Sequence, residues 1–412
     1  MNFDEALKYI QNKSKFGINL ELETTSELLD KIGNPHKKLN FIHIAGTNGK
    51  GSTTSYIADI LMKKGYKTGK YISPAVHSFT ERMQINNEEI SHEDLAHFTS
   101  VVKDAAEKYN ISPTEFELET VIGMLYFESK KCDYVVLEVG MGGRYDATNV
   151  IPPPKMAVIT SISLDHTEYL GDTVEKIAFE KCGIIKEGSM VVSYADNPEE
   201  ANNVIKNAAS EKNAPLFIPD KKDINIISES VNGTDFCYKK EKYHINMLGS
   251  HQVLNAVSAI EVSKKLGIEY DTIKSAIENT KFRGRFEIAS KNPFIIEDGA
   301  HNYSGVANLK NSLKKYFPDK KIILVMSMLN DKEYSKCIKL ISPIASTFIA
   351  CEINNSRKAS AQAIASEAKK YVDDVMVIPN VNDAVKAAKE KYDENTIICI
   401  CGSLYLLGEI KE

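Results

Sequence analysis

Residues 39–65 read LNFIHIAGTNGKGSTTSYIADILMKKG, and this stretch decides the fold. Its apolar start at 39–46 predicts a β-strand, and a helix is predicted to begin directly after the glycines. Between the two lies HIAGTNGKGST at 43–53, a glycine-rich turn that carries a lysine and two hydroxyl residues. Glycines let backbone N–H groups approach phosphate oxygens, and a helix N-terminus adds partial positive charge. The stretch therefore predicts a phosphate loop.

The loop departs from the usual pattern G-x-x-x-x-G-K-[ST] at two positions. Ile44 stands where the first glycine belongs, and Gly51 separates Lys50 from the hydroxyl groups. We expect Lys50 to place positive charge on the β- and γ-phosphates of ATP, and Ser52 or Thr53 to reach Mg²⁺. The alternative is a chance glycine-rich turn before a helix.

Outward from the loop, short apolar runs alternate with helical patterns, which predicts parallel sheets with crossover helices. A basic segment at 281–287 separates two such regions. The short, more polar alternating segments at 216–246 predict a small antiparallel extension. Helices are expected at 1–16, 250–265 and 269–280. The expected strands lie at 39–46, 68–73, 134–140, 156–163 and 189–194, and then at 294–299, 321–327, 346–351, 375–379 and 396–402.

Composition bounds the class of protein. The 412 residues are enough for two domains, and the 43% hydrophobic and 26% charged residues are typical of a globular enzyme. A formal charge of −5 predicts no nucleic-acid partner. No apolar run is long enough for a membrane span or a signal peptide, so no membrane association is expected. The seven cysteines lack regular spacing, which predicts reduced thiols and a cytoplasmic location. Two covered domains favour a monomer.

Further motifs follow the loop in order. They are SPAVHSFTERMQ (73–84), TEFE (114–117), EVGMGGRYDATN (138–149), LDH (164–166), EK (180–181), HQVLNA (251–256), GRFE (284–287), DGAHN (298–302) and GSLYLLGEI (402–410). With GTNGKGS at 46–52, this set resembles folylpolyglutamate synthase and the bifunctional dihydrofolate synthase of the Mur ligase superfamily. The resemblance implies an α/β fold: a Mur-ligase-like ATPase domain with the phosphate loop at 1–288, and a smaller Rossmann-like domain at 289–412.

The resemblance implies an ATP- and Mg²⁺-dependent ligase that adds L-glutamate to dihydropteroate or to reduced folates through an acyl phosphate. The segment at 142–149, GGRYDATN, resembles bifunctional members and favours both activities. Polyglutamylation alone is the alternative within the family. A Mur-type ligase acting on another substrate and a regulatory phosphate-loop module without ligase activity are the further alternatives.

The family's nucleotide contacts are implied on both sides of an interdomain cleft. Arg285 is expected to reach the phosphates and Asp298 the ribose. His301 is expected to lie near the nucleotide, although Tyr303, in the same loop, stands where the family often has proline. Asn255 is expected to contact ATP, or alternatively to pack within its helix. The implied set is Asn48, Gly49, Lys50, Gly51, Ser52, Asn255, Arg285, Asp298 and His301.

The implied metal ligands are Ser73, Glu138 and His166, and Lys50, His166 and Lys181 are the implied catalytic residues. Glu138 ends an apolar strand, where a carboxylate is costly unless it is paired or binds metal. His166 alone would be a structural loop histidine. Lys181 occupies the position of the family's carbamylated lysine. CO₂ adds only to a neutral amine, so its pKa must be lowered. The alternative is a solvated helix lysine.

The pterin-like substrate is implied to bind Phe116, Glu117, Tyr145, Asp146 and Ala147. An aromatic ring can stack on a flat heterocycle, and a carboxylate can pair with its aminopyrimidine edge. Without the family, Phe116 would be a core residue and Glu117 a surface residue. For L-glutamate, Arg357, Asp331 and Lys332 are loop candidates without assigned roles.

Overall fold

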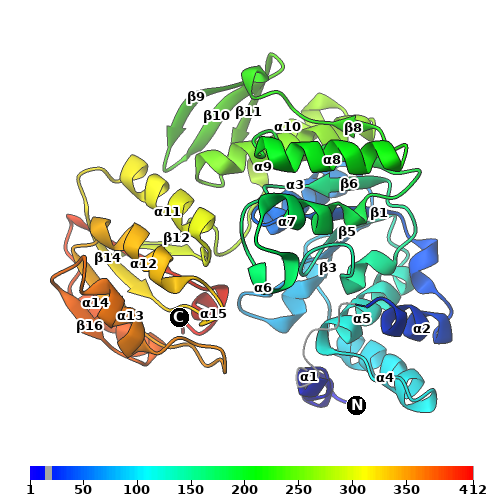
Figure 1. Ribbon diagram of the computed structural model, residues 1–412, viewed down its shortest axis with the longest axis horizontal. Helices are drawn as coiled ribbons and strands as arrows, with labels where there is room; N and C mark the ends of the chain where they lie inside the picture. Colours follow the sequence, from blue (N-terminus) through cyan, green and yellow to red (C-terminus); the bar gives the residue numbers. More distant parts are fainter. Residues whose placement is uncertain (14–20, 412) are drawn as a thin grey trace.

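The structure, a computed structural model, describes residues 1–13 and 21–411. Two α/β units, each built on its own sheet, lie side by side, and the small third sheet lies near both (Figure 1). The N-terminal helix α1 spans Phe3–Gln11, and the last part of its predicted range, 14–16, lies outside the described residues. No helix in the described part of the chain is long and apolar enough to cross a membrane.

The first sheet has eight strands in the order β4-β3-β2-β5-β1-β6-β7-β8, with the phosphate-loop strand β1 between β5 and β6. The six neighbouring strands β2, β5, β1, β6, β7 and β8 are parallel. The remaining two strands, β3 and β4, form an antiparallel edge beside β2. All five strands predicted for this region are present. The strands are β1 (Phe41–Ala45), β2 (Thr68–Tyr71), β3 (Met83–Ile85), β4 (Glu88–Glu89), β5 (Tyr134–Glu138), β6 (Met156–Ile159), β7 (Met190–Ser193) and β8 (Leu216–Phe217).

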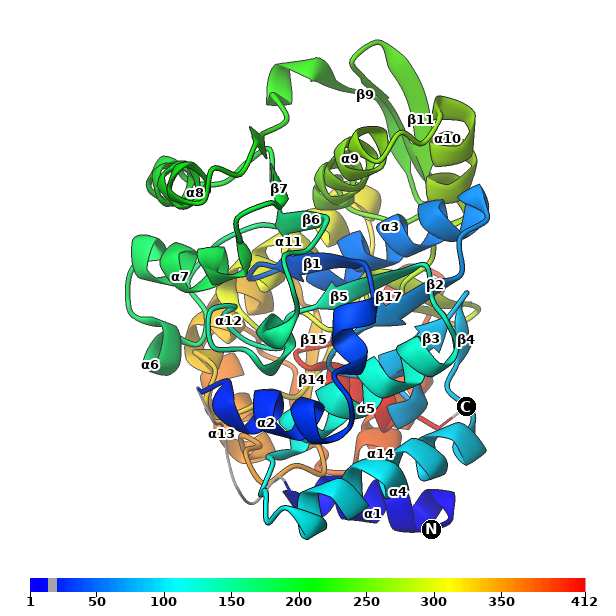
Figure 2. The ribbon, with the colours of Figure 1, turned by 90° about the vertical axis from the view of Figure 1, so that its right-hand side faces the viewer.

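Helices cover both faces of this sheet, which explains its nearly continuous apolar strands. On one face, Ile42 and Ile44 pack in a core with helices α3, α9 and α10; on the other, Phe41 packs with α4 and α5, and Ala45 with α7 and α8 (Figure 2). The helices are α2 (Glu23–Lys31), α3 (Lys50–Lys64), α4 (His92–Lys108), α5 (Glu115–Ser129), α6 (Thr167–Leu170), α7 (Val174–Lys181), α8 (Glu199–Glu211), α9 (Ser250–Lys265) and α10 (Tyr270–Asn279).

The predicted antiparallel extension is confirmed as a three-stranded sheet of order β11-β10-β9. Its strands are β9 (Ile224–Ser230), β10 (Gly233–Tyr238) and β11 (Glu241–Ile245). The first residues of the predicted range do not belong to this small sheet. They form β8, which pairs with β7 in the large sheet.

The second unit has a six-stranded sheet of order β12-β13-β17-β14-β15-β16, parallel except for its edge strand β12. Helices α11, α12 and α13 cover one face, and α14 and α15 the other. The elements are β12 (Glu287–Lys291), β13 (Phe294–Asp298), α11 (Tyr303–Tyr316), β14 (Lys321–Met326), α12 (Tyr334–Ile341), β15 (Thr347–Ala350), α13 (Ala361–Ala368), β16 (Val375–Val377), α14 (Val381–Glu390), β17 (Thr396–Cys401) and α15 (Leu404–Gly408).

The five strands predicted for the second region are all present, and the predicted class of two α/β domains is confirmed. The division at 288/289 stays a prediction. It falls inside β12, which pairs with β13 and so shares the sheet of the second unit.

Candidate active site

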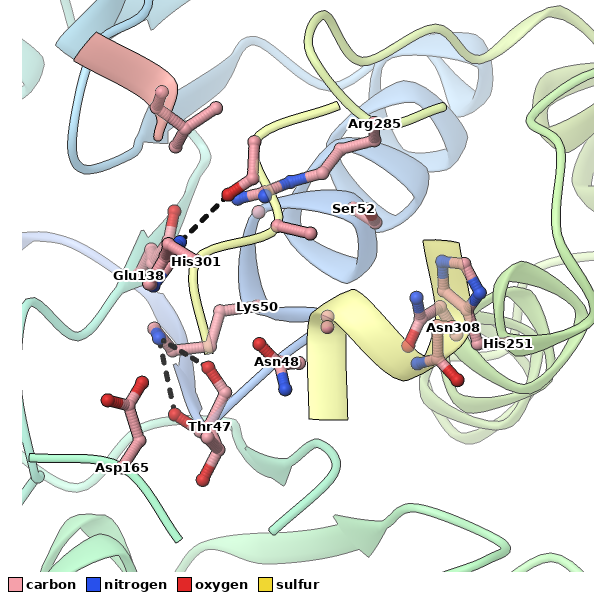
Figure 3. A pocket seen from close by; sticks show the side chains of 18 of the residues that line it. Thr47, Asn48, Lys50, Ser52, Glu138, Asp165, His251, Arg285, His301 and Asn308 are labelled. Carbon is pink, nitrogen blue, oxygen red and sulfur yellow. Dashed lines mark hydrogen bonds between the residues drawn. The ribbon is translucent and has the colours of Figure 1, made fainter. Parts of the chain in front are cut away.

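The carboxyl ends of the parallel strands from both sheets open onto one cavity, where α/β folds bind their ligands. Every residue predicted for the nucleotide lines this cavity, and so do the predicted metal ligands and Lys181. In Figure 3 the charged side chains of Lys50, Glu138 and Asp165 gather on one side, while His251 and Asn308 lie on the other. The cavity can therefore hold an elongated ligand with its anionic end at the phosphate loop.

The phosphate loop requires glycine at positions 46 and 49, because neighbouring atoms leave no space for a side chain there. A Cβ atom at Gly46 would lie 1.7 Å from Oγ1 of Thr160, and one at Gly49 would lie 2.4 Å from Oδ1 of Asn255. Gly49 also has a φ of 84°, which favours glycine. The tight loop leads directly into α3, so the backbone N–H groups of the first helical turn are available to an anion.

Lys50 begins α3 and folds back over the loop. Its Nζ donates to the carbonyl oxygens of Gly46 and Thr47 at 3.2 and 3.3 Å (Figure 3). Burial lowers the pKa of Lys50, while the carboxylates of Glu138 and Asp165 oppose that effect. Neutral carbonyls are weak partners for a half-buried ammonium group, so a phosphate group is a better partner.

Glu138 ends β5 and is 4% exposed. Burial raises its pKa to about 7, against the lowering effect of Lys50 and of the backbone N–H of Ser73, which lies 3.3 Å from Oε2. Burial also lowers the pKa of His166 to about 4, which leaves a neutral imidazole able to accept a cation. The Nε2 atom of this histidine lies 3.2 Å from Nζ of Lys332.

The donors of Ser73, Glu138 and His166 fit a small hard cation. Within residues 1–13 and 21–411, no three His, Cys, Asp or Glu side chains form a possible metal site. A Mg²⁺ ion here would therefore depend on hydroxyl, phosphate and water oxygens as well. Ser52 lines the cavity, and its hydroxyl accepts a hydrogen bond from Nε2 of Gln252 at 3.2 Å.

Lys181 is 4% exposed at the end of α7, which excludes the alternative of a solvated helix lysine. Its Nζ donates to the carbonyl oxygen of Gly46 at 2.9 Å, so it contacts the phosphate loop directly. Burial, followed by the positive charge of Lys50, lowers its pKa to about 7. A substantial neutral fraction of this amine therefore exists near neutral pH.

A polar network that the sequence did not reveal crosses between the two units. The side-chain amides of Asn48 and Asn302 exchange hydrogen bonds of 3.3 and 3.1 Å, and Asn302 also donates to Asp165 at 2.9 Å. Lys332 forms a buried ion pair with Asp165 at 2.7 Å. Burial alone would raise the pKa of Asp165, but Lys332, His166 and His301 together hold it well below its usual range.

A second cavity adjoins the first, and the two share a wall that includes Ser73, Met141 and His166. All five residues predicted for the pterin-like substrate line it. They are Phe116, Glu117, Tyr145, Asp146 and Ala147.

Two of these side chains have clear local roles. The ring of Phe116 lies against the backbone of Gly140, where a Cβ would be only 2.5 Å from it. The carboxylate of Glu117 accepts hydrogen bonds from N and Oγ1 of Thr114 at 2.8 and 2.9 Å. This contact forms the capping box that starts α5, so Glu117 is buried and not the surface residue of the alternative.

The far wall of the second cavity comes from the second unit. It includes the loop candidates Asp331, Lys332 and Arg357, and Arg357 pairs with Asp331 at 2.9 Å. Arg82, which sequence reasoning did not single out, also lines this cavity and forms an ion pair of 2.9 Å with the buried carboxylate of Glu119.

Comparison with known proteins agrees with this geometry. Residues 44–263 match the family model described as Mur ligase middle domain, and residues 284–404 match Mur ligase, glutamate ligase domain. The Bacillus subtilis dihydrofolate synthase/folylpolyglutamate synthase is 34% identical over 431 residues, which cover 100% of this chain and 98% of that protein.

Two solved structures are similar over nearly the whole length. The Escherichia coli FolC in complex with DHPP and ADP has a TM-score of 0.88 and 28% identity, covering 99% of this chain and 96% of that one. The Yersinia pestis bifunctional folylpolyglutamate synthase/dihydrofolate synthase complexed with AMPPNP and Mn ion has a TM-score of 0.87 and 28% identity, covering 99% and 97%.

The matches first define a class, because both units of the chain are those of a Mur ligase. Within this class, the chain belongs to the dihydrofolate synthase/folylpolyglutamate synthase family. The resemblance inferred from the motifs is confirmed.

Replacing Asp165 by asparagine is predicted to destabilise the protein, because it leaves the Lys332 ammonium buried without a counter-charge. Breaking a buried ion pair costs ~3–5 kcal/mol. Folding lowers the pKa of Asp165, so its carboxylate contributes to the free energy of unfolding at every pH above the ordinary pKa of an aspartate. This contribution is lost only in acid. The fall in thermal unfolding temperature should therefore be the same at about pH 6 and pH 8.

The matched control is Asp331→Asn, which breaks the more exposed pair with Arg357. Such pairs contribute less than ~1 kcal/mol. Equal shifts for Asp165→Asn and Asp331→Asn would contradict a stabilising role for the buried pair.

Proposed function

We propose that this protein is an ATP-dependent ligase that joins the amine of L-glutamate to the carboxylate of dihydropteroate and of reduced folates, forming ADP and phosphate. The observation that carries this proposal is the wall shared by a phosphate-loop cavity and an aromatic-lined cavity. A carboxylate at this wall would face the γ-phosphate of ATP. The names of the relatives, and the DHPP and ADP bound in the Escherichia coli structure, support the same substrates.

Amide formation in water requires an activated carboxylate, and phosphoryl transfer from ATP supplies an acyl phosphate. Negative charge grows on oxygen in this step and again when the amine attacks, so fixed positive charge should dominate catalysis. We assign this role to Lys50 on the phosphate loop and to Arg285, which lines the same cavity. Asp298 accepts the N–H groups of Phe286 and Ala300 at 2.8 and 2.7 Å, which fixes its carboxylate beside the cavity.

The remaining site assignments are proposals of the same kind. Asn48, Gly49, Gly51, Ser52, Asn255 and His301 would complete the nucleotide site. Ser73, Glu138 and His166 would hold Mg²⁺, which when bound neutralises phosphate charge. The Mn ion in the Yersinia pestis structure supports a divalent cation.

The alternatives differ in what they leave unexplained. A regulatory phosphate-loop module needs neither the second sheet nor the second cavity. A ligase for another Mur-type substrate would not require an aromatic-lined cavity next to the phosphate loop. Polyglutamylation alone stays open within the family. A cytoplasmic location stays our proposal, supported by seven free cysteines, of which Cys237 alone is not buried. A monomer also stays our proposal.

The proposal predicts that purified protein with ATP, Mg²⁺ and labelled L-glutamate produces labelled product from both dihydropteroate and tetrahydrofolate. Chromatography of parallel reactions measures each activity. Product from tetrahydrofolate alone would restrict the enzyme to polyglutamylation. ATP hydrolysis that neither folate nor L-glutamate stimulates would contradict the ligase function.

Lys50→Ala and His166→Ala are each predicted to abolish amide formation. The first removes the positive charge beside the transferred phosphoryl group, where such electrostatic contacts contribute about 10²–10³-fold in rate. The second removes a proposed Mg²⁺ ligand. Steady-state product formation measures both effects, and Lys64→Ala, which removes an exposed pairing with Glu269 on the far end of α3, is the control. Full turnover by either site variant would remove that residue from the mechanism.

We further propose that Lys181 is carbamylated. The Lys181→Ala variant is then predicted to lose most activity and to recover part of it with added short carboxylates. The neutral amine increases as pH rises through about 7, so ¹³C-bicarbonate should label the wild-type protein more readily at about pH 8 than at pH 6. An absent carbamate ¹³C signal, together with normal activity of Lys181→Ala, would contradict the modification.

A further inference from the structure

His43 lies in the middle of β1, where an imidazole is out of place. It is 0% exposed, and its neighbours in the parallel sheet are Leu137 on β5 and Ala157 on β6. Burying a polar ring among aliphatic strands costs free energy unless the ring is hydrogen-bonded. Neither cavity is lined by His43, so it does not touch a ligand directly.

The imidazole has one polar partner among the described residues. Its Nε2 lies 2.9 Å from Oγ1 of Thr148, while its Nδ1 has no partner. The hydroxyl of Thr148 lies 2.5 Å from Oδ1 of Asp146 and must donate its single proton to that carboxylate. Oγ1 of Thr148 must therefore accept the hydrogen bond from Nε2 of His43, so the proton of this imidazole is on Nε2. Burial lowers the pKa of His43 to about 3, so the ring stays neutral.

These contacts end on a carboxylate in the wall of the second cavity. Oδ1 of Asp146 accepts from both the hydroxyl and the N–H of Thr148, the latter at 3.0 Å, and Oδ2 accepts from the N–H of Met141 at 2.8 Å. A carboxylate has about four acceptor positions, so about one remains for a ligand. Burial raises the pKa of Asp146, while the hydrogen bonds from Thr148 and Met141 and the positive charge of Lys50 oppose that effect.

We infer that His43 and Thr148 are positioning residues that hold the Asp146 carboxylate in the orientation needed to accept a hydrogen bond from the substrate heterocycle. The inference rests on the proposed function, because it takes the second cavity as the heterocycle site. The physical basis is the unbroken series of donors from β1 to this cavity, in which each group has one possible direction of donation.

The series also ties the two cavities together. The strand that carries His43 continues through Ala45 into the phosphate loop at Gly46. A displacement of β1 would therefore move the nucleotide site and the Asp146 carboxylate together. This arrangement keeps the substrate's position constant relative to the γ-phosphate.

The alternative is a purely structural role, in which Asp146 caps the short 3₁₀ helix at Ala147–Val150 and His43 only satisfies Thr148. The two roles differ in what their loss affects. A structural contact lowers thermal stability and affects both substrates alike. A positioning contact raises KM for the heterocyclic substrate selectively.

The test compares Thr148→Val, which removes the hydroxyl but keeps the shape, with Thr148→Ser, which keeps the hydroxyl. KM for dihydropteroate and KM for ATP are measured separately, together with the unfolding temperature. Thr148→Val should raise KM for dihydropteroate about tenfold or more, as expected for one lost hydrogen bond to a charged group, with KM for ATP changed less than about twofold. Thr148→Ser should recover most of the loss.

A second pair keeps the test valid if a threonine variant fails to fold. His43→Gln retains an amide donor at the position of Nε2, whereas His43→Met does not, so only the methionine variant should raise KM for dihydropteroate. Thr99→Val is the matched control, because Thr99 is a buried threonine of α4 with no side-chain partner among the described residues. It should change neither KM.

The Asp146→Asn variant distinguishes the positioning role of His43 and Thr148 from the assignment of the second cavity as the heterocycle site. If it raises KM for dihydropteroate but Thr148→Val and His43→Met do not, the positioning role is wrong and the cavity assignment stands. If Asp146→Asn itself leaves that KM unchanged, the cavity assignment fails and the positioning role with it. Equal increases in both KM values, or a Thr148→Ser variant as impaired as Thr148→Val, would also overturn the inference.

Discussion

Desolvation of charge around the phosphate loop is the constraint on which the rest of the structure depends. Lys181 is buried and Lys50 is half-buried, and both donate to the carbonyl oxygen of Gly46. Burial lowers the pKa of each lysine and raises that of Glu138 nearby. Such a cluster is costly to bury without ionic partners. In the function proposed above, a nucleotide phosphate would supply the negative charge beside Lys50, and a divalent cation the positive charge beside Glu138.

The second α/β unit closes the site through two groups of contacts. At the cavity, Asn302 and Lys332 reach across to Asn48 and Asp165. Away from it, the three-stranded sheet supplies another contact, because the hydroxyl of Tyr316 donates to Glu229 at 2.6 Å and accepts the N–H of Gly249 at 3.0 Å. The first group contains Asn48 of the phosphate loop itself, so we expect ligand binding and the relative position of the two units to be coupled.

The sequence predicted the strands covered on both faces and the local motifs, because these depend on short stretches. It missed β3, β4 and β12, which lie at or beside sheet edges and are too short or too polar to stand out. The site residues that the family motifs imply all line one or both of the two cavities. The contacts of Asp165 with Asn302 and Lys332 could not be predicted, because the partners lie 137 and 167 residues apart in the chain.

The central claim is that phosphate-loop groups and the second unit bind one nucleotide from opposite walls. A crystal structure of this protein with a non-hydrolysable ATP analogue and Mg²⁺ tests it most directly. The account predicts the γ-phosphate beside Lys50 and the phosphate-loop N–H groups, with Arg285 on the phosphates and Asp298 on the ribose. A nucleotide bound at the loop with Arg285 and Asp298 both out of contact would contradict it.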